Sequence, residues 1–281
     1  MTLRDALRQS IERLDHHGIS SPRLAAEVLL AHCLSVDRTF LYTHDEVELS
    51  ATQLQCLEDA VWERASGVPV QYIVGRQEFF GRYFRVNPTV LIPRPETELL
   101  VERVLELHPK AESRIIDVGT GSGCIGITLA LELPEAQVFL ADISLEAVQT
   151  ARSNAKELGA TNASLACMDL LEAANGPFHF IVSNPPYVSF AESSRLQREV
   201  REHEPQVALY AGDDGLAAYR RLIPRARQLL CEGGYLAMEI GFGLEESVLA
   251  LFDDSWEKLP TLADLQGIPR IVCARLRTRA T

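Results

Sequence analysis

A short apolar run that ends in three alternating glycines narrows the choice of folds for this chain. Residues 115–123 read Ile-Ile-Asp-Val-Gly-Thr-Gly-Ser-Gly, which predicts a buried strand that leads into a glycine loop. Such a loop lets the backbone approach a ligand closely and aims helix N–H groups at an anion. Because ligands of open α/β sheets bind at the carboxyl ends of the strands, we predict a cofactor site after this first strand.

Strand and helix patterns alternate along the chain after Lys110. Apolar runs predict strands at 114–118, 137–141, 164–167, 178–183 and 234–240, helical patterns lie at 123–132, 144–158 and 215–231, and 268–274 predicts a further, antiparallel strand. This alternation implies a mostly parallel sheet with helices on both faces. The predicted fold class is therefore α/β, with a Rossmann-like catalytic domain at 111–281.

The residues before this domain carry other patterns. Apolar side chains recur at helical spacing from Leu3 to Leu14, and similar stripes follow, so residues 1–75 predict a small helical bundle. Residues 76–110 predict a linker, in which a short hairpin turns near Gly81 and a stiff proline-rich segment leads into a helix. We therefore expect a helical domain, a hairpin linker and a catalytic domain, in that order.

The net charge of the chain argues against a nucleic-acid partner. Its 281 residues carry 27 Lys and Arg against 39 Asp and Glu, a formal net charge of −12, whereas phosphate binding needs clustered basic side chains. The six cysteines and seven histidines form no metal or redox spacing, so we expect reduced thiols and no metal. With no secretory signal and no apolar stretch of ~18 residues, we expect a cytoplasmic enzyme without a membrane partner.

The glycine loop alone leaves the cofactor open. Residues 121–126 satisfy the GxGxxG pattern of dinucleotide-binding folds. The glycine spacing at 119–123, preceded by Asp117, instead resembles motif I of class I S-adenosylmethionine methyltransferases. Asp142 ends the next strand and fits a ribose hydroxyl, which both cofactors carry. The choice between NAD and S-adenosylmethionine must therefore come from a reactive site.

A candidate reactive site follows the strand predicted at 178–183, which ends in Asn184-Pro185-Pro186-Tyr187. Prolines cannot donate ladder hydrogen bonds and hold the preceding residues extended, so the backbone carbonyls are free to accept. The Asn184 amide oxygen and a proline carbonyl suit the two N–H bonds of a planar NH₂ group. The Tyr187 ring would cover the plane of that group.

Such a pocket suits methylation of a carboxamide nitrogen. That nitrogen is a poor nucleophile, because its lone pair is delocalised into the carbonyl. Accepting both N–H hydrogens holds the NH₂ group and favours a pyramidal nitrogen whose lone pair can face a sulfonium methyl. A NAD dehydrogenase would need a His or Lys acid/base instead, and residues 183–190 contain neither.

Two overlapping sets of site residues follow from these motifs. Asp169, after the third predicted strand, would border the adenine pocket with Leu170, or would alternatively cap a helix. The predicted cofactor-binding residues are Gly119, Thr120, Gly121, Ser122, Gly123, Asp142, Asp169, Leu170 and Asn184. The predicted catalytic residues are Asn184, Pro185 and Tyr187, and the predicted substrate-binding residues are Asn184, Pro185, Pro186 and Tyr187.

Three motifs occur together in this chain. They are Asp-Val-Gly-Thr-Gly-Ser-Gly-Cys-Ile at 117–125, Ser-Asn-Pro-Pro-Tyr-Val at 183–188 and Leu-Ile-Pro-Arg-Pro-Glu-Thr-Glu at 91–98. Together they resemble the HemK-type protein-glutamine N5-methyltransferases, and the likeness covers most of the chain. Nucleic-acid amino-methyltransferases share Asn-Pro-Pro-Tyr, so the 91–98 segment is the more specific marker.

The resemblance implies an activity, a cofactor and a partner. The cofactor would be S-adenosyl-L-methionine, bound at Gly119–Gly123, Asp142 and Asn184. The substrate would be the glutamine of the Gly-Gly-Gln motif in class I peptide chain release factors, held by Asn184–Tyr187. Domain 1–75 would dock the release factor, and the methylation would support translation termination.

Several alternatives stay open at this point. Ribosomal-protein glutamine methyltransferases share much of the pattern, and a nucleic-acid amino-methyltransferase would use the same pocket with base flipping. A NAD oxidoreductase and a binding module with a decayed methyltransferase fold are less consistent with the intact motifs. We expect a monomer and a structural role for Glu239, and the roles of Arg94 and Glu96 stay undetermined.

Overall fold

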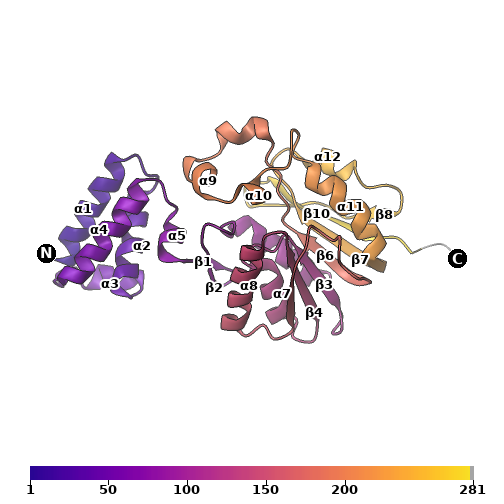
Figure 1. The fold of residues 1–281 in the computed structure, drawn as a ribbon, viewed down its shortest axis with the longest axis horizontal. Helices are drawn as coiled ribbons and strands as arrows, with labels where there is room; N and C mark the ends of the chain where they lie inside the picture. Colours follow the sequence, from indigo (N-terminus) through magenta and orange to yellow (C-terminus); the bar gives the residue numbers. More distant parts are fainter. Residues whose placement is uncertain (279–281) are drawn as a thin grey trace. The chain divides into compact units, whose positions relative to one another are not determined.

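A computed structural model describes residues 1–278 of the chain (Figure 1). The last residues of the predicted catalytic domain, 279–281, lie outside the described residues. The described chain forms two compact units. The first contains Met1–Arg76 together with Gln197–His203, and the second contains Gln77–Leu196 and the chain from Glu204 onward.

The second unit is built on one large sheet, which confirms the predicted α/β class. Its strands are β3 (Arg114–Val118), β4 (Gln137–Asp142), β5 (Ala163–Cys167), β6 (Phe178–Ser183), β7 (Leu230–Glu239), β8 (Trp256–Lys258), β9 (Leu262–Ala263) and β10 (Pro269–Leu276). Their order is β5-β4-β3-β6-β7-β10-β8, with β9 beside β10. The strands from β5 to β7 are parallel, and β10 runs antiparallel to β7, as the apolar run at 268–274 predicts.

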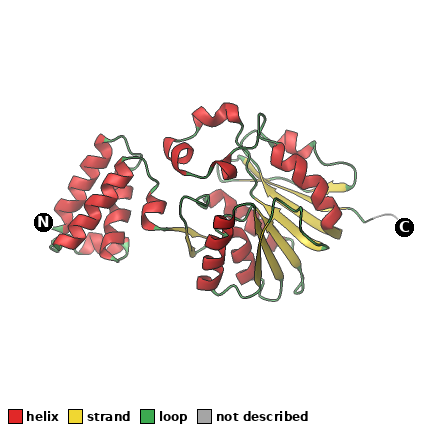
Figure 2. Cartoon of the chain, viewed as in Figure 1, coloured by secondary structure: helices red, strands yellow, loops and turns green. Residues whose placement is uncertain are grey.

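Helices cover both faces of this sheet (Figure 2). Those of the second unit are α6 (Glu98–Glu106), α7 (Cys124–Glu132), α8 (Leu145–Leu158), α10 (Gln206–Leu209), α11 (Ala217–Leu229) and α12 (Glu245–Leu249), with short 3₁₀ turns η1 (Pro95–Thr97) and η2 (Phe190–Arg195). Successive residues of β3 point to opposite faces, so Ile115 packs in the cluster with α6 and α7 while Ile116 packs in the cluster with α11. The sheet is therefore buried on both sides, as parallel sheets usually are.

The predicted hairpin is present as β1 (Arg76–Phe79) and β2 (Arg82–Arg85). The Asn154 side chain attaches it to the sheet unit. Its Oδ1 accepts from the Arg85 N–H at 2.8 Å, and its Nδ2 donates to the carbonyls of Arg85 at 3.0 Å and Ser122 at 2.8 Å. One buried amide therefore joins the hairpin, α8 and the loop after β3.

The first unit is a bundle of helices, as residues 1–75 predict. Its helices are α1 (Leu3–His16), α2 (Pro22–Leu34), α3 (Arg38–Thr43), α4 (Ala51–Ala65), α5 (Val70–Val74) and α9 (Arg198–His203). Leu3, Leu14 and Leu29 are fully buried in its core. None of the helices in the described part of the chain has the length and apolarity needed to cross a membrane.

Helix α9 joins the bundle although its residues come from the catalytic part of the sequence. Glu199 of α9 forms an ion pair with Arg64 of α4, with 2.6 Å between Nη2 and Oε2. The Arg64 side chain is buried and also donates to the Val68 carbonyl at 3.0 Å. Because a buried charge without a partner is costly, this pair ties α9 to α4.

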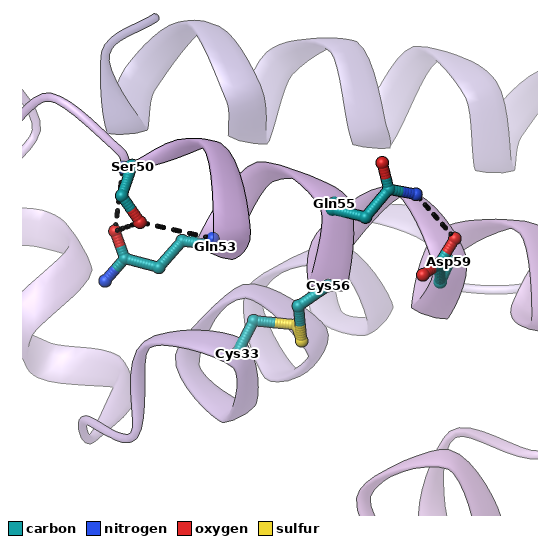
Figure 3. Close-up of a disulfide and its surroundings, with 6 residues drawn as sticks. All are labelled: Cys33, Ser50, Gln53, Gln55, Cys56 and Asp59. Carbon is teal, nitrogen blue, oxygen red and sulfur yellow. Dashed lines mark hydrogen bonds between the residues drawn. A yellow bond between two sulfur atoms is a disulfide. The ribbon is translucent and has the colours of Figure 1, made fainter.

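A disulfide joins Cys33 of α2 to Cys56 of α4 (Figure 3). Their Cα atoms lie 5.8 Å apart, a separation that suits a disulfide. The expectation that all thiols are reduced is therefore wrong for this pair, which α2–α4 packing brings together across 23 residues of sequence. Close by, the Ser50 side chain caps the Gln53 N–H and the Gln53 side chain caps the Ser50 N–H, which starts α4.

We predict that the disulfide forms in the purified protein and stabilises the bundle. Alkylation of the denatured protein without reductant should label only the four free cysteines, and alkylation after reduction should label all six. Closing a loop of this size removes entropy from the unfolded chain and should contribute about 3 kcal/mol, so reductant should lower the Tm. The variant Cys33→Ser should show the lower Tm with and without reductant. Labelling of all six cysteines before reduction would contradict the prediction.

Candidate active site

The motifs found in the sequence meet at the carboxyl ends of four parallel strands. β3 pairs with β4 on one side and with β6 on the other. The chain adds β4 and β5 on one side of β3 and then crosses over to add β6 and β7 on the other side, so the direction of strand addition changes at β3. Such switch points leave a crevice in which ligands bind. A cavity of about 280 Å³ lies here, within the second unit, and its lining includes Gly119, Gly121, Asp142, Asp169, Leu170, Asn184 and Pro186.

The glycine loop after β3 presents bare backbone to this cavity. Gly121 has a φ of +56°, a conformation that side chains rarely adopt, and a Cβ built on it would meet no atom within 4 Å. The Gly121 N–H donates to Asp142 Oδ2 at 2.8 Å, which ties the loop to the end of β4. The loop therefore leaves an open cradle that a ligand of the cavity can approach closely.

Asp142 lies at the rim of this cradle. Its Oδ1 accepts from the Ser144 N–H at 2.9 Å, and its Oδ2 accepts from Gly121. Burial raises the pKa of Asp142 above its usual range, although both backbone N–H groups oppose the shift. Each carboxylate oxygen keeps a second lone pair, so the residue can still accept hydrogen bonds from hydroxyl groups in the cavity.

The side chains of Thr120 and Ser122 do not line the cavity, although both residues were predicted to bind the cofactor. Both are buried, and Thr120 Oγ1 donates to Asp117 Oδ2 inside the loop. Asp117 Oδ2 also accepts from the Gly126 N–H at 2.9 Å, and burial raises the pKa of Asp117 to about 7. The Thr120 and Asp117 side chains therefore brace the loop from behind. Gly123, the N-cap of α7, is also absent from the lining.

Asp169 and Leu170 follow β5 and also line the cavity. The alternative that Asp169 caps a helix is wrong, because the residues after it form turns. Its carboxylate instead pairs with Arg221 of α11, with 2.7 Å between Oδ2 and Nη2. Arg221 lines the same cavity and also pairs with Glu172 at 2.8 Å.

The Asn-Pro-Pro-Tyr segment leaves β6 at the edge of the cavity. Asn184 and Pro186 line it, whereas Pro185 is buried and Tyr187 packs against the core beneath. A Cβ on Gly241 would come within 2.8 Å of Tyr187 Cδ2, so a glycine is needed for the ring to sit there. Burial raises the pKa of Tyr187, so its phenol stays neutral and its ring acts as an apolar surface.

Backbone hydrogen bonds hold the end of this segment against another part of the cavity wall. The Val188 N–H donates to the Leu209 carbonyl, and the Ala211 N–H donates to the Val188 carbonyl, both at 2.9 Å. Ala211 and its neighbour Tyr210 line the cavity. The sequence did not predict the wall at 205–212, because its short helix α10 is too short to carry a recognisable apolar periodicity.

The proline-rich motif at 91–98 also lies beside the site. Leu91 lines the cavity, and Arg94 Nη2 pairs with the buried carboxylate of Glu204, which also accepts from the Ile92 N–H at 3.3 Å. Glu98 Oε1 accepts from the Phe80 N–H at 2.8 Å and so joins the motif to the hairpin. The motif therefore acts as a brace between the hairpin and the cavity wall.

Two further buried residues adjoin Asn184 and were not predicted as site residues. Asn184 Nδ2 donates to Thr97 Oγ1 at 3.2 Å, and Thr97 Oγ1 donates to Glu239 Oε2 at 2.6 Å. Burial raises the pKa of Glu239 to about 7. The signals present in the sequence were the position of Thr97 inside the 91–98 motif and an acid at the end of an apolar strand.

In the described residues, no group of three or more His, Cys, Asp or Glu side chains could hold a metal.

Two families match parts of this chain. The PrmC N-terminal domain matches residues 5–75, and the methyltransferase small domain matches residues 95–203. Among solved structures, the hMettl16 catalytic domain aligns with a TM-score of 0.57 at 16% identity, over 79% of this chain and 84% of that one. The ribosomal protein L11 methylase of Lactobacillus delbrueckii subsp. bulgaricus aligns with a TM-score of 0.51 at 21% identity, over 72% and 89%. At these identities, the structural likeness shows the Rossmann-like methyltransferase fold alone.

Curated relatives match over nearly the whole length. The release factor glutamine methyltransferase of Koribacter versatilis is 44% identical over 281 residues, which cover 99% of this chain and 100% of that protein. The release factor glutamine methyltransferase of Geobacter sulfurreducens is 41% identical, over 98% of this chain and 97% of that protein. With the predicted motifs gathered around one cavity, these matches show that the chain belongs to the release factor glutamine methyltransferase family.

Proposed function

We propose that this protein transfers the methyl group of S-adenosyl-L-methionine to the side-chain amide nitrogen (N5) of the glutamine in the Gly-Gly-Gln motif of class I peptide chain release factors. The observation that carries the proposal is that Asn184 and Pro186 line the same cavity as the glycine loop and Asp142. A cofactor and an amide substrate bound there would meet at the end of β6. The names of the curated relatives supply the substrate class.

The residues around the cavity fit S-adenosyl-L-methionine. The bare backbone at Gly121 leaves room for the cofactor's close approach, and Asp142 retains lone pairs for ribose hydroxyls. Leu170 supplies an apolar surface and Asp169 a carboxylate that can accept from the adenine amino group. The cavity, at about 280 Å³, is close to the lower end of ligand pockets, about 300 Å³. When bound, the cofactor supplies an electrophilic methyl group on a sulfonium.

The chain's own residues would prepare the glutamine for attack. Asn184 Oδ1 and the Pro185 carbonyl accept the two N–H bonds of the substrate amide, which orients the NH₂ group and draws electron density toward nitrogen. The Tyr187 ring, neutral and packed on the core, covers the amide plane. No strong base is needed before attack, because the proton leaves after the nitrogen has gained positive charge. Catalysis therefore depends on orientation and hydrogen bonding rather than on a general base.

The function predicts a specific modification. Incubation with S-adenosyl-L-methionine should add one methyl group to the Gly-Gly-Gln peptide of a class I release factor, as read by mass spectrometry of its tryptic peptides. A ribosomal protein should be incubated in parallel, because methylation of that protein in place of the release factor would assign a different substrate. No methylation of the release factor, with cofactor binding demonstrated by calorimetry, would contradict the proposal.

Removal of the Asn184 amide should abolish most of the activity. The variant Asn184→Ala takes away an acceptor of the substrate NH₂ group, so kcat should fall about 100-fold to 1000-fold, the loss typical of one preorganised hydrogen-bonding group. Asn175, exposed in the loop before β6, provides the matched control, and Asn175→Ala should keep wild-type kinetics. Radiolabelled methyl transfer to the release factor measures both variants. Equal rates for the two would show that Asn184 does not contact the reacting amide.

Removal of the Asp142 charge should weaken cofactor binding. The variant Asp142→Asn keeps the shape of the side chain but replaces one acceptor oxygen by an NH₂ group, so affinity for S-adenosyl-L-methionine should fall about 10-fold to 100-fold. Titration calorimetry measures the Kd directly. Asp254, exposed before β8 at the other edge of the sheet, is the control, and Asp254→Asn should bind like the wild type. An unchanged Kd for Asp142→Asn would remove Asp142 from the cofactor site.

A further inference from the structure

A chain of hydrogen-bonded polar side chains leads from the half-buried Asn184 to two buried residues. Asn184 Nδ2 donates to Thr97 Oγ1 at 3.2 Å, and Thr97 Oγ1 donates to Glu239 Oε2 at 2.6 Å. Thr97 and Glu239 are each only 2% exposed. We propose that Thr97 and Glu239 are positioning residues that hold the Asn184 amide with its oxygen toward the cavity. The proposal deepens the proposed function and rests on it for the role of that oxygen.

Strand register brings these side chains together. Ser183 of β6 lies opposite Met238 of β7. The next residues along the two strands, Asn184 and Glu239, are therefore neighbours at the carboxyl ends of β6 and β7. Thr97 ends η1, the short turn within the 91–98 motif that precedes α6. The 91–98 motif therefore contributes a residue that bridges Asn184 to Glu239.

The direction of the hydrogen bonds follows from the chemistry of the groups. An ionised carboxylate only accepts, so the single hydroxyl hydrogen of Thr97 is used on Glu239. The Thr97 oxygen then offers lone pairs to Asn184, and only the NH₂ side of that amide can donate to them. A half-turn of the amide would place Asn184 Oδ1 against the Thr97 oxygen with no hydrogen between them. The network therefore selects one of two amide orientations that have almost the same shape.

The surroundings of Glu239 keep this arrangement in place. Burial raises the pKa of Glu239 to about 7, and the charge of Glu96 adds to the rise, while the Thr97 hydroxyl, the positive charge of Arg270 and a direct hydrogen bond from the Asn184 amide lower it. The Tyr219 hydroxyl donates to the Glu239 backbone carbonyl at 2.9 Å and fixes the end of β7. Above that pKa, Glu239 is a carboxylate and can accept from Thr97.

The selected orientation matters because the substrate group is itself a donor. A glutamine NH₂ can bind Asn184 Oδ1, whereas a rotated Asn184 would present its own N–H bonds to it. Without the Thr97 hydroxyl, the Asn184 NH₂ group would keep only its direct hydrogen bond to Glu239, so the rotated, unproductive orientation would gain population. Thr97 and Glu239 are not among the residues that line the cavity, and they act only through Asn184.

The test compares two substitutions at position 97 with a matched control. Thr97→Val removes the hydroxyl at constant shape, and Thr97→Ser retains it. Thr128 of α7 is buried with no hydrogen-bond partner for its hydroxyl in the described residues, so Thr128→Val controls for a buried threonine-to-valine change. Assays above the pKa of Glu239 should give a kcat about 10-fold to 100-fold lower for Thr97→Val. The Kd for S-adenosyl-L-methionine should be unchanged, and Thr97→Ser and Thr128→Val should retain wild-type kcat.

A second readout is independent of which protein is methylated. In ¹H–¹⁵N spectra, the Asn184 side-chain NH₂ pair, identified by its absence in Asn184→Ala, should be protected from solvent exchange in the wild type, Thr97→Ser and Thr128→Val. Protection should fall in Thr97→Val, where only the direct hydrogen bond to Glu239 remains. Wild-type kcat or undiminished protection in Thr97→Val would overturn the positioning role while leaving the proposed function intact. If protection falls in Thr97→Val but the wild type methylates no release factor, the proposed function is contradicted and the positioning role is not.

Discussion

Parallel pairing of β3 with β4 on one side and with β6 on the other places the motifs of the site together at the carboxyl ends of these strands. Strands that run in the same direction end together, so the glycine loop, Asp142 and Asn184 surround one cavity despite their separation in the sequence. The pairing of β6 with β7 then places Glu239 beside Asn184. A shift of any of these strands by one residue would turn the site side chains to the other face.

Short-range patterns were sufficient to predict the parallel strands, the antiparallel strand β10 and the motifs at the strand ends, but not the short edge strands β8 and β9. The apolar run before Gly119 and the paired prolines after Asn184 are local in sequence, and each restricts the backbone by itself. Asp142 was predictable because an acid at the end of the second parallel strand has a fixed place relative to the first. In each case, the evidence needed lies within a few residues of the feature predicted.

Features that depend on packing between distant segments were not predictable. Thr97 lies 87 residues from Asn184 and 142 residues from Glu239 in the sequence, and no local sequence pattern predicts that these side chains form hydrogen bonds with one another. The pairing of Cys33 with Cys56 depends in the same way on which faces of α2 and α4 meet. For Thr120, the pattern located the loop correctly, but the direction of the side chain depends on the buried carboxylate of Asp117 behind it.

The ion pair between Glu199 and Arg64 has a consequence for dissecting the protein. The chain leaves the Asn-Pro-Pro-Tyr segment, contributes α9 to the helical bundle, and returns at Glu204 to form the cavity wall. A fragment that begins after the bundle would keep α9 but lose Arg64, and would leave Glu199 without its partner. A cut at the hairpin therefore does not separate two independent domains. A catalytic fragment that keeps the native fold of the second unit would need residues 197–203 replaced by a linker that does not require the helical bundle.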